Sequence, residues 1–556
     1  MIERIVKLLA REIRGLHQTA YLLALFALLS SFLALVRDRI LAGEFGAGEI
    51  LDIYYTAFRI PDILFFTIAL MVSVFVLIPL LNSYKDQNKS KELIGSIIMA
   101  FALILIGIDL VLFPFIPVIL NKFFPALMNG EYGYELVWMS RIMLLQPLFL
   151  GISNILSAVT QTAGRYILYA TAPLLYNIGI ISGVLLFYPI FGIYGLALGV
   201  IMGALAHMSI QIPFLRANGF LTLDTFKIRI GETLKIIKIS LPRTLGMSAS
   251  HIAFFFLYSV ASGITTGAVS VIQLANNLQA APVNIIGSSY SVAAFPTLSR
   301  LFAQQKMDKF KEHISLAIRH IIFWSMPLIA VVVVLRAHIV RLVLGSGAFD
   351  WTDTRLTAAV LAIFIITLTF QSISLLLVRA FYAIGNTFIP FIINVSIAIF
   401  MIIFAYVFLH YINHHIFLQT VLAYILRINN VDGANILVIP LAFASASIIN
   451  AFLLTVVFSL KFGKIKVGRV LSDSIVSAFA FALTIYFSLH ILDNYVSINT
   501  TFGLLIQASI SLIVGALVWS FVLVLFKSKE FVEIISTLSS KFWKRKAISD
   551  IDNTTI

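Results

Sequence analysis

The feature that most constrains this sequence is a recurring run of apolar residues about as long as a lipid bilayer is thick. The first run, Ala20 to Val36, contains seventeen residues without a Lys, Arg, Asp or Glu. About 20 apolar residues in a helix span the hydrocarbon core and satisfy every backbone polar group internally. Such runs recur along the chain, which is 60% hydrophobic and 12% charged, whereas soluble domains are about 25% charged. The sequence therefore predicts an all-α polytopic membrane protein.

We expect about fourteen transmembrane helices, an even number that places both termini on one side of the membrane. The termini and the loops on their side hold 28 of the 39 Lys and Arg, and the opposite loops hold five. Cytoplasmic loops carry an excess of basic residues, so both termini are predicted to be cytoplasmic. The expected spans lie near residues 20–42, 52–82, 93–118, 136–162, 166–187, 190–215, 234–263, 268–300, 315–338, 355–384, 388–412, 434–460, 470–492 and 502–526.

The net charge of +14 could suggest nucleic acid, but this uneven loop charge accounts for most of it. The basic C-terminal stretch KSKEFVEIISTLSSKFWKRKAIS is interpreted as an interfacial segment attracted to anionic lipid. Binding of this tail to nucleic acid is the alternative that we set aside. The N-terminus mixes both charges, and no cleavable signal peptide is expected there.

A weak internal repeat suggests that spans 1–6 and 7–12 are two copies of one six-helix bundle. The pattern Pro-x-x-x-Asn recurs at an offset of 217 residues, and two other prolines are offset by 221. Chance is the alternative, since proline is common in membrane helices; parallel repeats are common in transporters that rock around a central site. The expected domains are an N-lobe (1–217), a C-lobe (218–465) and a third part with spans 13 and 14 and the tail (466–556). The repeated positions are Pro173 and Asn177, Pro390 and Asn394, and Pro61 and Pro282.

Charged residues gather at the end of the first span and in the second. Asp52, Arg59 and Asp62 are seven and three residues apart, which places them on one helical face. With Arg37 and Asp38 they are expected to form a cluster in which opposite charges keep one another ionised. In the alternative interpretation, the basic residues reach the outer headgroups and Asp52 caps the second span.

The eighth span carries polar residues along one face of an otherwise apolar helix. A polar stripe is unfavourable against lipid, so it is expected to face other helices or a wet cavity. Contacts between helices explain it without a cavity, and both interpretations stay open. Arg243, beside Pro242 in the seventh span, is the predicted charged partner. The stripe consists of Gln273, Asn277, Asn284, Ser288 and Ser291.

No catalytic or metal-binding pattern stands out, and we expect a protein that is not an enzyme and needs no cofactor. Cysteine is absent, which rules out disulfides, thiol catalysis and cysteine-ligated metal. There is no G-x-x-x-x-G-K-[ST] and no H-E-x-x-H. Three histidines in HYINHH (410–415) fall in a predicted outer loop, where solvated side chains are a simpler explanation than a metal site.

Several stretches resemble one known family. VRDRILAGEFGAGEILDIYYTAFRIPDIL resembles the signature of the first two helices of the MurJ/MviN lipid II flippases, in the multidrug/oligosaccharidyl-lipid/polysaccharide exporter superfamily. The resemblance continues through LPRTLGMSASHI, AVSVIQLANNLQAAPVNIIGSSYSVAAFPTLSRLF, VRLVLGSGAFDWTDTRLTAAVLAIF and RAFYAIGNTFIPF, in order over most of residues 20–410. It implies two pseudo-symmetric six-helix lobes around a central cavity, and two last helices that form a groove for the lipid tail.

The resemblance also implies roles for individual residues. Arg37 and Asp38 match the family's pair on the first helix, and Asp52 matches its acidic residue before the second. Arg59 falls where the family has a basic residue before Pro61. We therefore expect Arg37 and Asp38 to work as a pair in the cavity, and leave Arg39 as the residue that reaches the headgroups.

The chain departs from the family at three cavity positions that usually carry arginine. Those positions correspond here to Ser31, Phe65 and Asn277, so only Arg37 of the four arginines is kept. A pyrophosphate needs nearby cations more than it needs particular helices, and other arginines can supply them. The candidates for this substitution are Arg59, Arg141 and Arg243. The full set of expected substrate-binding residues is Arg37, Asp38, Asp52, Arg59, Arg243, Gln273, Asn277 and Asn284.

The expected function is a lipid II flippase of the bacterial cytoplasmic (inner) membrane. It would move an undecaprenyl-pyrophosphate-linked peptidoglycan precursor to the outer leaflet by alternating access driven by the membrane potential. The expected partners are this lipid-linked precursor and the bilayer, with no nucleic acid, and the chain is expected to act as a monomer. The alternatives are a related exporter of another polyprenyl-linked glycan or a drug, a membrane-embedded glycosyltransferase, and a scaffold. The glycosyltransferase would need a catalytic carboxylate on a large outer loop, and the outer loops are short.

Overall fold

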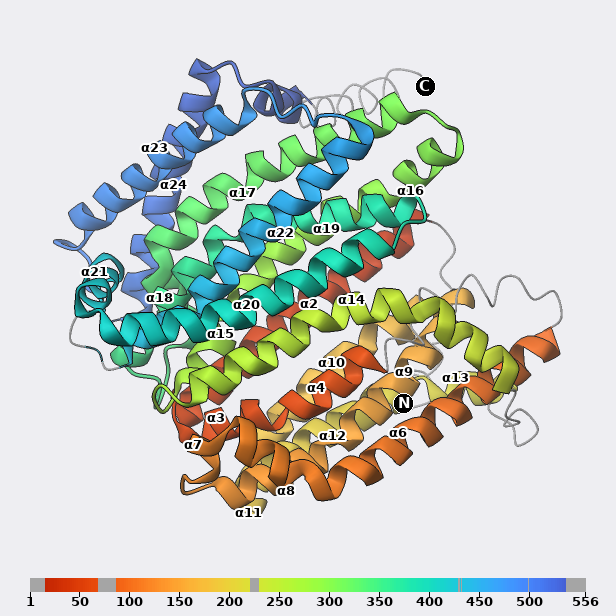
Figure 1. Cartoon of the computed structure of the whole chain (residues 1–556). Helices are drawn as coiled ribbons and strands as arrows, with labels where there is room; N and C mark the ends of the chain where they lie inside the picture. Colours follow the sequence, from red (N-terminus) through yellow and green to blue (C-terminus); the bar gives the residue numbers. More distant parts are fainter. Residues whose placement is uncertain are drawn as a thin grey trace, which may run out of the picture. The chain divides into compact units, whose positions relative to one another are not determined.

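The fold is entirely helical in the residues that the structure describes. The computed structural model describes residues 16–68, 87–220, 230–428, 431, 433–498 and 500–536, without the side chains of 16–20, 87–89, 230, 232–243 and 247. Within these ranges every element is a helix, and several of the helices are long and apolar enough to cross a membrane (Figure 1). The predicted all-α membrane fold is therefore confirmed.

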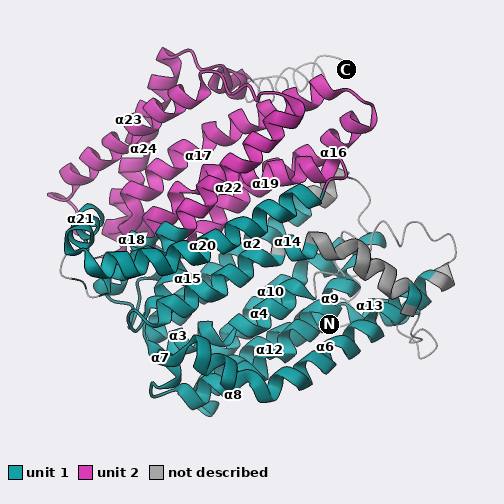
Figure 2. Ribbon diagram, viewed as in Figure 1, with its two compact units in different colours: residues 1–275, 343–360, 387–442 teal, residues 276–342, 361–386, 443–556 magenta. Residues whose placement is uncertain are grey.

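The chain forms two compact units, drawn in different colours in Figure 2. Unit 1 consists of residues 1–275, 343–360 and 387–442, and unit 2 of residues 276–342, 361–386 and 443–556. Their boundaries differ from the expected lobe boundaries at 217 and 465. The division into two repeated six-helix lobes concerns an internal symmetry and stays a prediction.

Unit 1 contains the first helices of the chain and two later groups. In chain order they are α2 (Leu16–Phe45), α3 (Glu49–Ala57), α4 (Arg59–Thr67), α6 (Gln87–Phe123), α7 (Pro125–Met128), α8 (Gly133–Met143), α9 (Leu145–Thr162), α10 (Tyr166–Ser182), the π-helical η2 (Gly183–Phe187), α11 (Tyr188–Phe191), α12 (Tyr194–Ser209), α13 (Ile212–Ala217), α14 (Ile230–Ser262), α20 (Phe388–His414), α21 (Ile416–Leu426) and the 3-10 turn η5 (Ala434–Leu437).

Unit 2 contains the last helices and the middle of the chain, and four helices continue from one unit into the other. Its own elements are the π-helical η4 (Asn284–Ser288), α16 (Ser289–Ala303), α19 (Leu368–Ala383), α23 (Val470–Leu492) and α24 (Thr501–Leu525). The helices that continue across a boundary are α15 (Ala268–Val283), α17 (Met307–Leu344), α18 (Trp351–Ile366) and α22 (Val438–Phe462).

The expected count of fourteen spans is not confirmed. Among the described residues, eleven helices are long and apolar enough to cross a membrane, or twelve if the bent pair α18 and α19 is one span. The pair bends by 45° at Thr367, where the side chain of Gln371 donates to Thr367 Oγ1. Side chains that insert next to the helical ladder are a known cause of such bends. The expected spans outside this count are those near 52–82 and 268–300.

The expected second span is broken near its start. Proline at position 61 has no N–H for the carbonyl of Ala57, and its ring crowds that carbonyl. The helix accordingly ends at Ala57, and α4 begins at Arg59. The rest of this expected span, from residue 69, lies outside the described residues.

Glycines bring α10 and α12 together at backbone distance. Gly179 on α10 and Gly183 at the start of η2 face Gly199 and Gly203 on α12, and a Cβ on Gly179 would lie 2.2 Å from the Gly203 Cα. Each helix thus contributes a G-x-x-x-G pattern, which lets membrane helices approach closely. Because α10 also packs on α2, this contact fixes the helix that carries Asn177.

A set of neutral polar side chains joins α9 to the junction between α12 and α13, and we call it the neutral network. The Gln211 amide donates to Ser153 Oγ at 2.7 Å. Its oxygen accepts from Ser157 Oγ at 3.1 Å and from Thr160 Oγ1 at 3.3 Å. Ser153 Oγ also lies 2.7 Å from His207 Nδ1. Gln211 is fully buried, so these bonds satisfy groups that water does not reach.

Candidate functional site

Arg37 and Asp38 form an ion pair near the end of α2. Arg37 Nε and Nη2 donate to Asp38 Oδ1 at 2.9 and 2.8 Å. Arg37 Nη1 donates to Asn177 Oδ1 on α10 at 3.0 Å, and the amide of Asn177 donates to the Pro173 carbonyl at 3.0 Å. Asp38 is buried, whereas the Arg37 side chain keeps 20% of its surface exposed. The structure therefore brings together the predicted pair and holds the guanidinium in one orientation.

Arg59 and Gln273 form a second group between α4, α14 and α15. Arg59 Nε donates to the Tyr55 carbonyl and Nη2 to Gln273 Oε1, both at 2.8 Å. Its guanidinium carbon lies 3.8 Å from the centre of the Tyr258 ring, and the Tyr258 hydroxyl donates to the same Gln273 oxygen at 2.7 Å. Two predicted residues are thus in contact, and a cation–π contact stabilises the cation.

The two arginine groups belong to one polar region of unit 1, which we call the polar cluster. Tyr176 on α10 interacts electrostatically with both Arg37 and Asp62. Asp62 in turn interacts electrostatically with Arg59. Each of the two arginines of the polar cluster therefore has a carboxylate nearby.

Asp52 caps a helix that is distant in sequence. Its Oδ2 accepts from the Gly267 N–H at 2.7 Å, and its Oδ1 accepts from the N–H and hydroxyl of Ser270 at 2.8 and 2.6 Å. These donors surround the first turn of α15, where backbone N–H groups have no partner within the helix and where a negative charge is favourable. Asp52 is fully buried, and it caps α15 and not its own helix, α3. Its role toward a substrate stays a prediction.

Further contacts join the end of α2 to the segment between α17 and α18. The Ala348 N–H donates to the Gly43 carbonyl at 2.7 Å, and the Ala47 N–H donates to Asp353 Oδ2 at 3.0 Å. Gly347 has a φ of +51°, and a Cβ there would lie 2.2 Å from the Gly43 oxygen. We call these contacts, together with the Asp52 cap, the latch.

Arg39 also belongs to the latch. It donates to the carbonyl of Val343 at 3.2 Å and to that of Gly345 at 3.4 Å. The expectation that Arg39 reaches the lipid headgroups is therefore wrong in this structure, because its guanidinium is held by backbone oxygens of a neighbouring segment. Carbonyl groups at the end of a helix such as α17 attract a cation for the same reason that headgroup phosphates do.

Of the arginines proposed to replace the missing cavity arginines, Arg141 has a described side chain and Arg243 does not. Arg141 on α8 donates to the Phe113 carbonyl at 3.1 Å, and its guanidinium lies over the rings of Phe113 and Trp138. These contacts place it at the α6–α8 seam and not with Arg37 and Arg59. Arg243 lies on α14, and its side chain lies outside the described residues.

The polar stripe of the eighth span is divided between the two units. Gln273 contacts Arg59 in unit 1, whereas Asn277 and Asn284 belong to unit 2. Asn277 is half-buried; Asn284 is exposed, and its side-chain oxygen accepts from Ser288 Oγ at 3.3 Å within η4. A role of Asn277 or Asn284 in substrate binding stays a prediction.

Sequence reasoning missed several residues of this site. Asn177 was recognised only as part of the repeat, although its oxygen contacts Arg37. Tyr258 gave no signal because a tyrosine in an apolar helix is ordinary. Asp109 on α6, which is not part of the groups described above, is a further polar residue that the sequence reasoning missed, and both of its buried oxygens lack a hydrogen-bond partner. Its position in an apolar stretch was the available signal, since an acidic residue inside a span is costly. No group of three metal-ligating side chains occurs in the described part of the chain.

A family model and curated relatives both point to the family that the sequence resembles. A family model described as "Lipid II flippase MurJ" matches residues 41–506. A protein from Buchnera aphidicola subsp. Acyrthosiphon pisum, named probable lipid II flippase MurJ, is 28% identical over 377 residues, covering 66% of this chain and 73% of the relative. A protein of the same name from Thermotoga maritima is 28% identical over 373 residues, covering 65% and 73%.

Solved structures share the fold. A structure titled "Lipid II flippase MurJ, inward closed conformation" has a TM-score of 0.73 and 22% identity, covering 93% of this chain and 100% of that chain. An inward-facing multidrug resistance transporter of the MATE family and the MOP superfamily has a TM-score of 0.63 and 16% identity, covering 78% and 94%. These likenesses concern the fold, and the expected helical architecture agrees with it.

Proposed function

The chain belongs to the lipid II flippase MurJ family, and we propose that it moves an undecaprenyl-pyrophosphate-linked peptidoglycan precursor from the inner to the outer leaflet by alternating access. Flippases are transporters, and the membership supports lipid II as the substrate and a bacterial inner membrane as the location. The proposal also places both termini in the cytoplasm. In this proposal the chain acts as a monomer and needs no cofactor or nucleic acid. The proposal does not specify whether a coupling ion binds.

The observation that carries the proposal is the latch beside the polar cluster. Its contacts join residues 39–52 to residues 267–270 and 343–353, which come from opposite halves of the expected repeat. In the proposed orientation the latch lies toward the outer face. Contacts of this kind support a state closed outward, in which a headgroup reaches the polar cluster from the inner leaflet. Breaking them would then open the cluster to the outside.

In this proposal Arg37 and Arg59 bind the headgroup. Asp38 and Asn177 hold the Arg37 guanidinium in place, and Gln273 and Tyr258 do the same for Arg59. An oriented guanidinium matches phosphate oxygens with two parallel hydrogen bonds. Arg243, Asn277 and Asn284 complete the proposed set. The lipid tail stays in the membrane or against α23 and α24.

The membrane potential is sufficient as the driving force in this scheme. A pyrophosphate with about two negative charges gains about 4–5 kcal/mol per 100 mV on moving outward, at about 2.3 kcal/mol per charge. No P-loop is present in the sequence, so the chain has no ATP site of that type. Export without ATP follows from the charge of the headgroup.

One observation favours the second candidate, a related exporter of another polyprenyl-linked glycan or a drug. The two arginines of the polar cluster are matched by Asp38 and Asp62, and the family's other arginine positions correspond to Ser31, Phe65 and Asn277. A cluster with balanced charge attracts a pyrophosphate less strongly than one with an excess of cations.

The deciding experiment measures lipid II exposed on the outer face of bacteria depleted of their own flippase. Cells that receive this protein should regain exposure, and cells that receive an Arg37→Ala variant should not. Arg141→Ala is the matched control, because it removes a half-buried arginine that lies outside the polar cluster. If the unchanged protein reaches the membrane and restores nothing, the second candidate replaces the first.

A further inference from the structure

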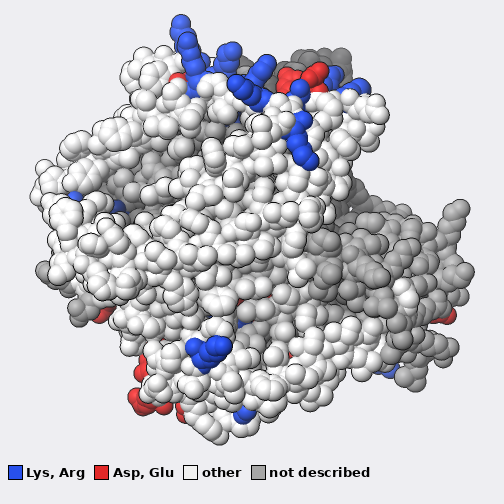
Figure 3. Space-filling view, in the orientation of Figure 1, with Lys and Arg blue, Asp and Glu red and all other residues white. Residues whose placement is uncertain are grey.

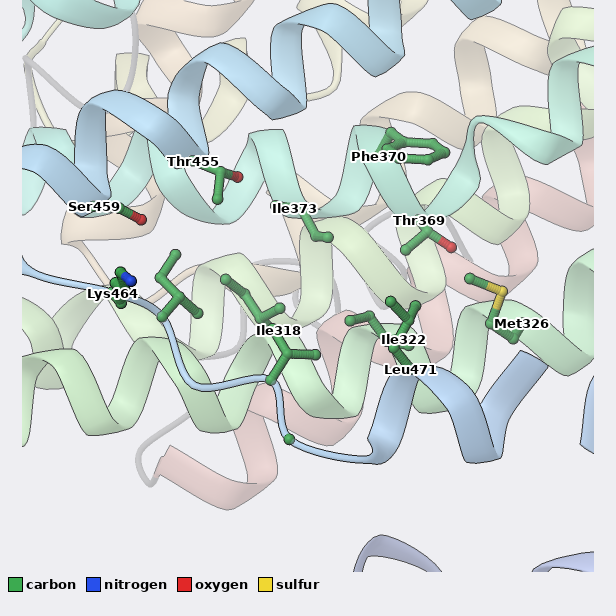
Figure 4. A pocket seen from close by; sticks show the side chains of 13 residues that line it. Ile318, Ile322, Met326, Thr369, Phe370, Ile373, Thr455, Ser459, Lys464 and Leu471 are labelled. Carbon is green, nitrogen blue, oxygen red and sulfur yellow. The ribbon is translucent and has the colours of Figure 1, made fainter. Parts of the chain in front are cut away.

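Unit 2 contains a cavity that plays no part in the proposed transport. Its volume is about 460 Å³, within the range of about 300–1,000 Å³ that ligand sites occupy. It lies between α17, α19 and α22, and the chain segment 463–469 that leads to α23 closes one side (Figure 4). The lining residues that matter here are Ile318, Ile322, Met326, Ile373, Ser459 and Lys464.

The wall of this cavity is apolar in its chemistry. Most lining side chains are apolar, and the hydroxyls of the two lining threonines already have hydrogen-bond partners. Thr455 Oγ1 donates to the Ala451 carbonyl at 2.7 Å, and Thr369 Oγ1 lies 2.6 Å from Ser325 Oγ. A ligand would therefore find few unsatisfied polar partners along the wall, which suits a hydrocarbon chain.

The two ends of the cavity differ. Figure 4 shows Ser459 and Lys464 at one end and Met326 with Thr369 at the other. Lys464 belongs to the stretch KFGKIKVGR (461–469), which carries four basic and no acidic residues. All four of these basic residues are exposed, and Figure 3 shows Lys and Arg side chains gathered over this end of unit 2. The cavity is thus amphipathic, with positive charge at one end.

The protein surface beside the Lys464 end of the cavity, which we call its mouth, is apolar. Leu460, directly before Lys461, is 80% exposed, and Leu471, which lines the cavity, is 44% exposed. In a membrane protein such residues face lipid, and a lysine next to them reaches the headgroup level. The mouth therefore lies where acyl chains and headgroups meet, on the side with the basic excess.

From these features we propose that the cavity binds one acyl chain of an anionic glycerophospholipid, with its phosphate on Lys464. A methylene group takes about the volume of one water in the liquid, ~30 Å³, so the cavity holds about fifteen of them. That matches one acyl chain and is far too small for a polyprenyl tail of about 55 carbons. The bound lipid would link α17, α19 and α22 to the start of α23. The proposal takes its leaflet, the inner one, from the proposed orientation.

The test is a lipid-binding measurement on the purified full chain, read by native mass spectrometry. Phosphatidylglycerol and phosphatidylcholine with the same 16-carbon chains are added separately after delipidation. We expect phosphatidylglycerol to bind about fivefold more tightly, which corresponds to about 1 kcal/mol for one basic residue near a phosphate. Lys464→Gln should remove that preference. Lys306→Gln, which removes an exposed lysine that does not line the cavity, should keep it.

A second pair of variants tests the cavity itself. Ile373→Trp fills the space from α19, and Val467→Trp fills it from the connecting segment, so that one remains informative if the other fails to fold. Each tryptophan variant should abolish the binding of phosphatidylglycerol, although Lys464 is unchanged in both. The proposal would be overturned if the unchanged protein bound both lipids equally, or if both tryptophan variants still bound phosphatidylglycerol. It would also be overturned if a polyprenyl phosphate displaced the bound phosphatidylglycerol. Because the readout is binding, none of these outcomes bears on lipid II transport.

Discussion

Two polar regions of unit 1 differ in what they connect. The neutral network joins α9 to the α12–α13 junction through Ser153, Ser157 and Gln211, all within about 60 residues of one another. The latch joins residues 39–52 to residues more than 200 positions away, and it uses the charged groups of Arg39, Asp52 and Asp353. Neutral bonds inside one half hold a packed bundle together. Charged bonds between the two halves of the expected repeat can be exchanged for water or substrate, which suits contacts that break during the transport cycle proposed above.

The strongest test of this difference is a covalent bond that keeps the latch closed. A Cβ at position 43 would lie 3.5 Å from the Ser346 Cβ, which is the Cβ separation of a disulfide, about 3.5–4.5 Å. The double variant Gly43→Cys/Ser346→Cys should lose all transport when oxidised and regain it with reductant. The sequence contains no other cysteine, so the single variants are clean controls. Full transport by the oxidised protein would mean that the latch stays closed throughout the cycle.

Removing the charge of the cap should loosen the latch without removing the side chain. Asp52→Asn keeps the shape but replaces one acceptor oxygen with a donor that faces other donors. Hydrogen bonds to a charged group contribute about 1.5–3 kcal/mol, so the open state should gain at least about tenfold in population. Labelling of a cysteine introduced at Ser346 by a membrane-impermeant thiol reagent measures this gain. Unchanged labelling would show that the cap does not hold the latch closed.

A change in the neutral network should lower the stability of the fold and leave the opening of the latch unchanged. Gln211→Leu removes the acceptor of the Ser157 hydroxyl and takes one partner each from Ser153 and Thr160. An unsatisfied buried group costs about 1–3 kcal/mol. We expect a lower midpoint of thermal unfolding and unchanged transport per folded molecule. Labelling at the latch should also stay unchanged. A variant that folds normally but transports poorly would place the neutral network in the transport machinery and remove the contrast drawn here.

The two regions also differ in how far the sequence predicted them. The cluster with Arg37, Asp38 and Arg59 was predicted because charged residues in an apolar chain demand partners, and two of the three are neighbours. The partner of Asp52 was not predicted, since helical periodicity orients a side chain but does not identify a helix 215 residues away. Likewise the break before Arg59 follows from Pro61 only once the carbonyl of Ala57 is considered. Long-range pairing depends on packing, which a single sequence does not report.

Arg39 provides the mildest test, because the hydrogen bonds that it donates in the latch go to neutral backbone carbonyls. It contacts the carbonyls of Val343 and Gly345 at 3.2 and 3.4 Å, distances at the long end for such bonds. Arg39→Gln should therefore destabilise the closed latch by about 0.5–1.5 kcal/mol, a severalfold increase in labelling at Ser346→Cys. Arg39→Lys, which keeps the charge, should fall between this variant and the unchanged protein. If Arg39→Gln raises labelling as much as Asp52→Asn does, the charge of the cap is not what distinguishes the latch, and its geometry alone explains closure.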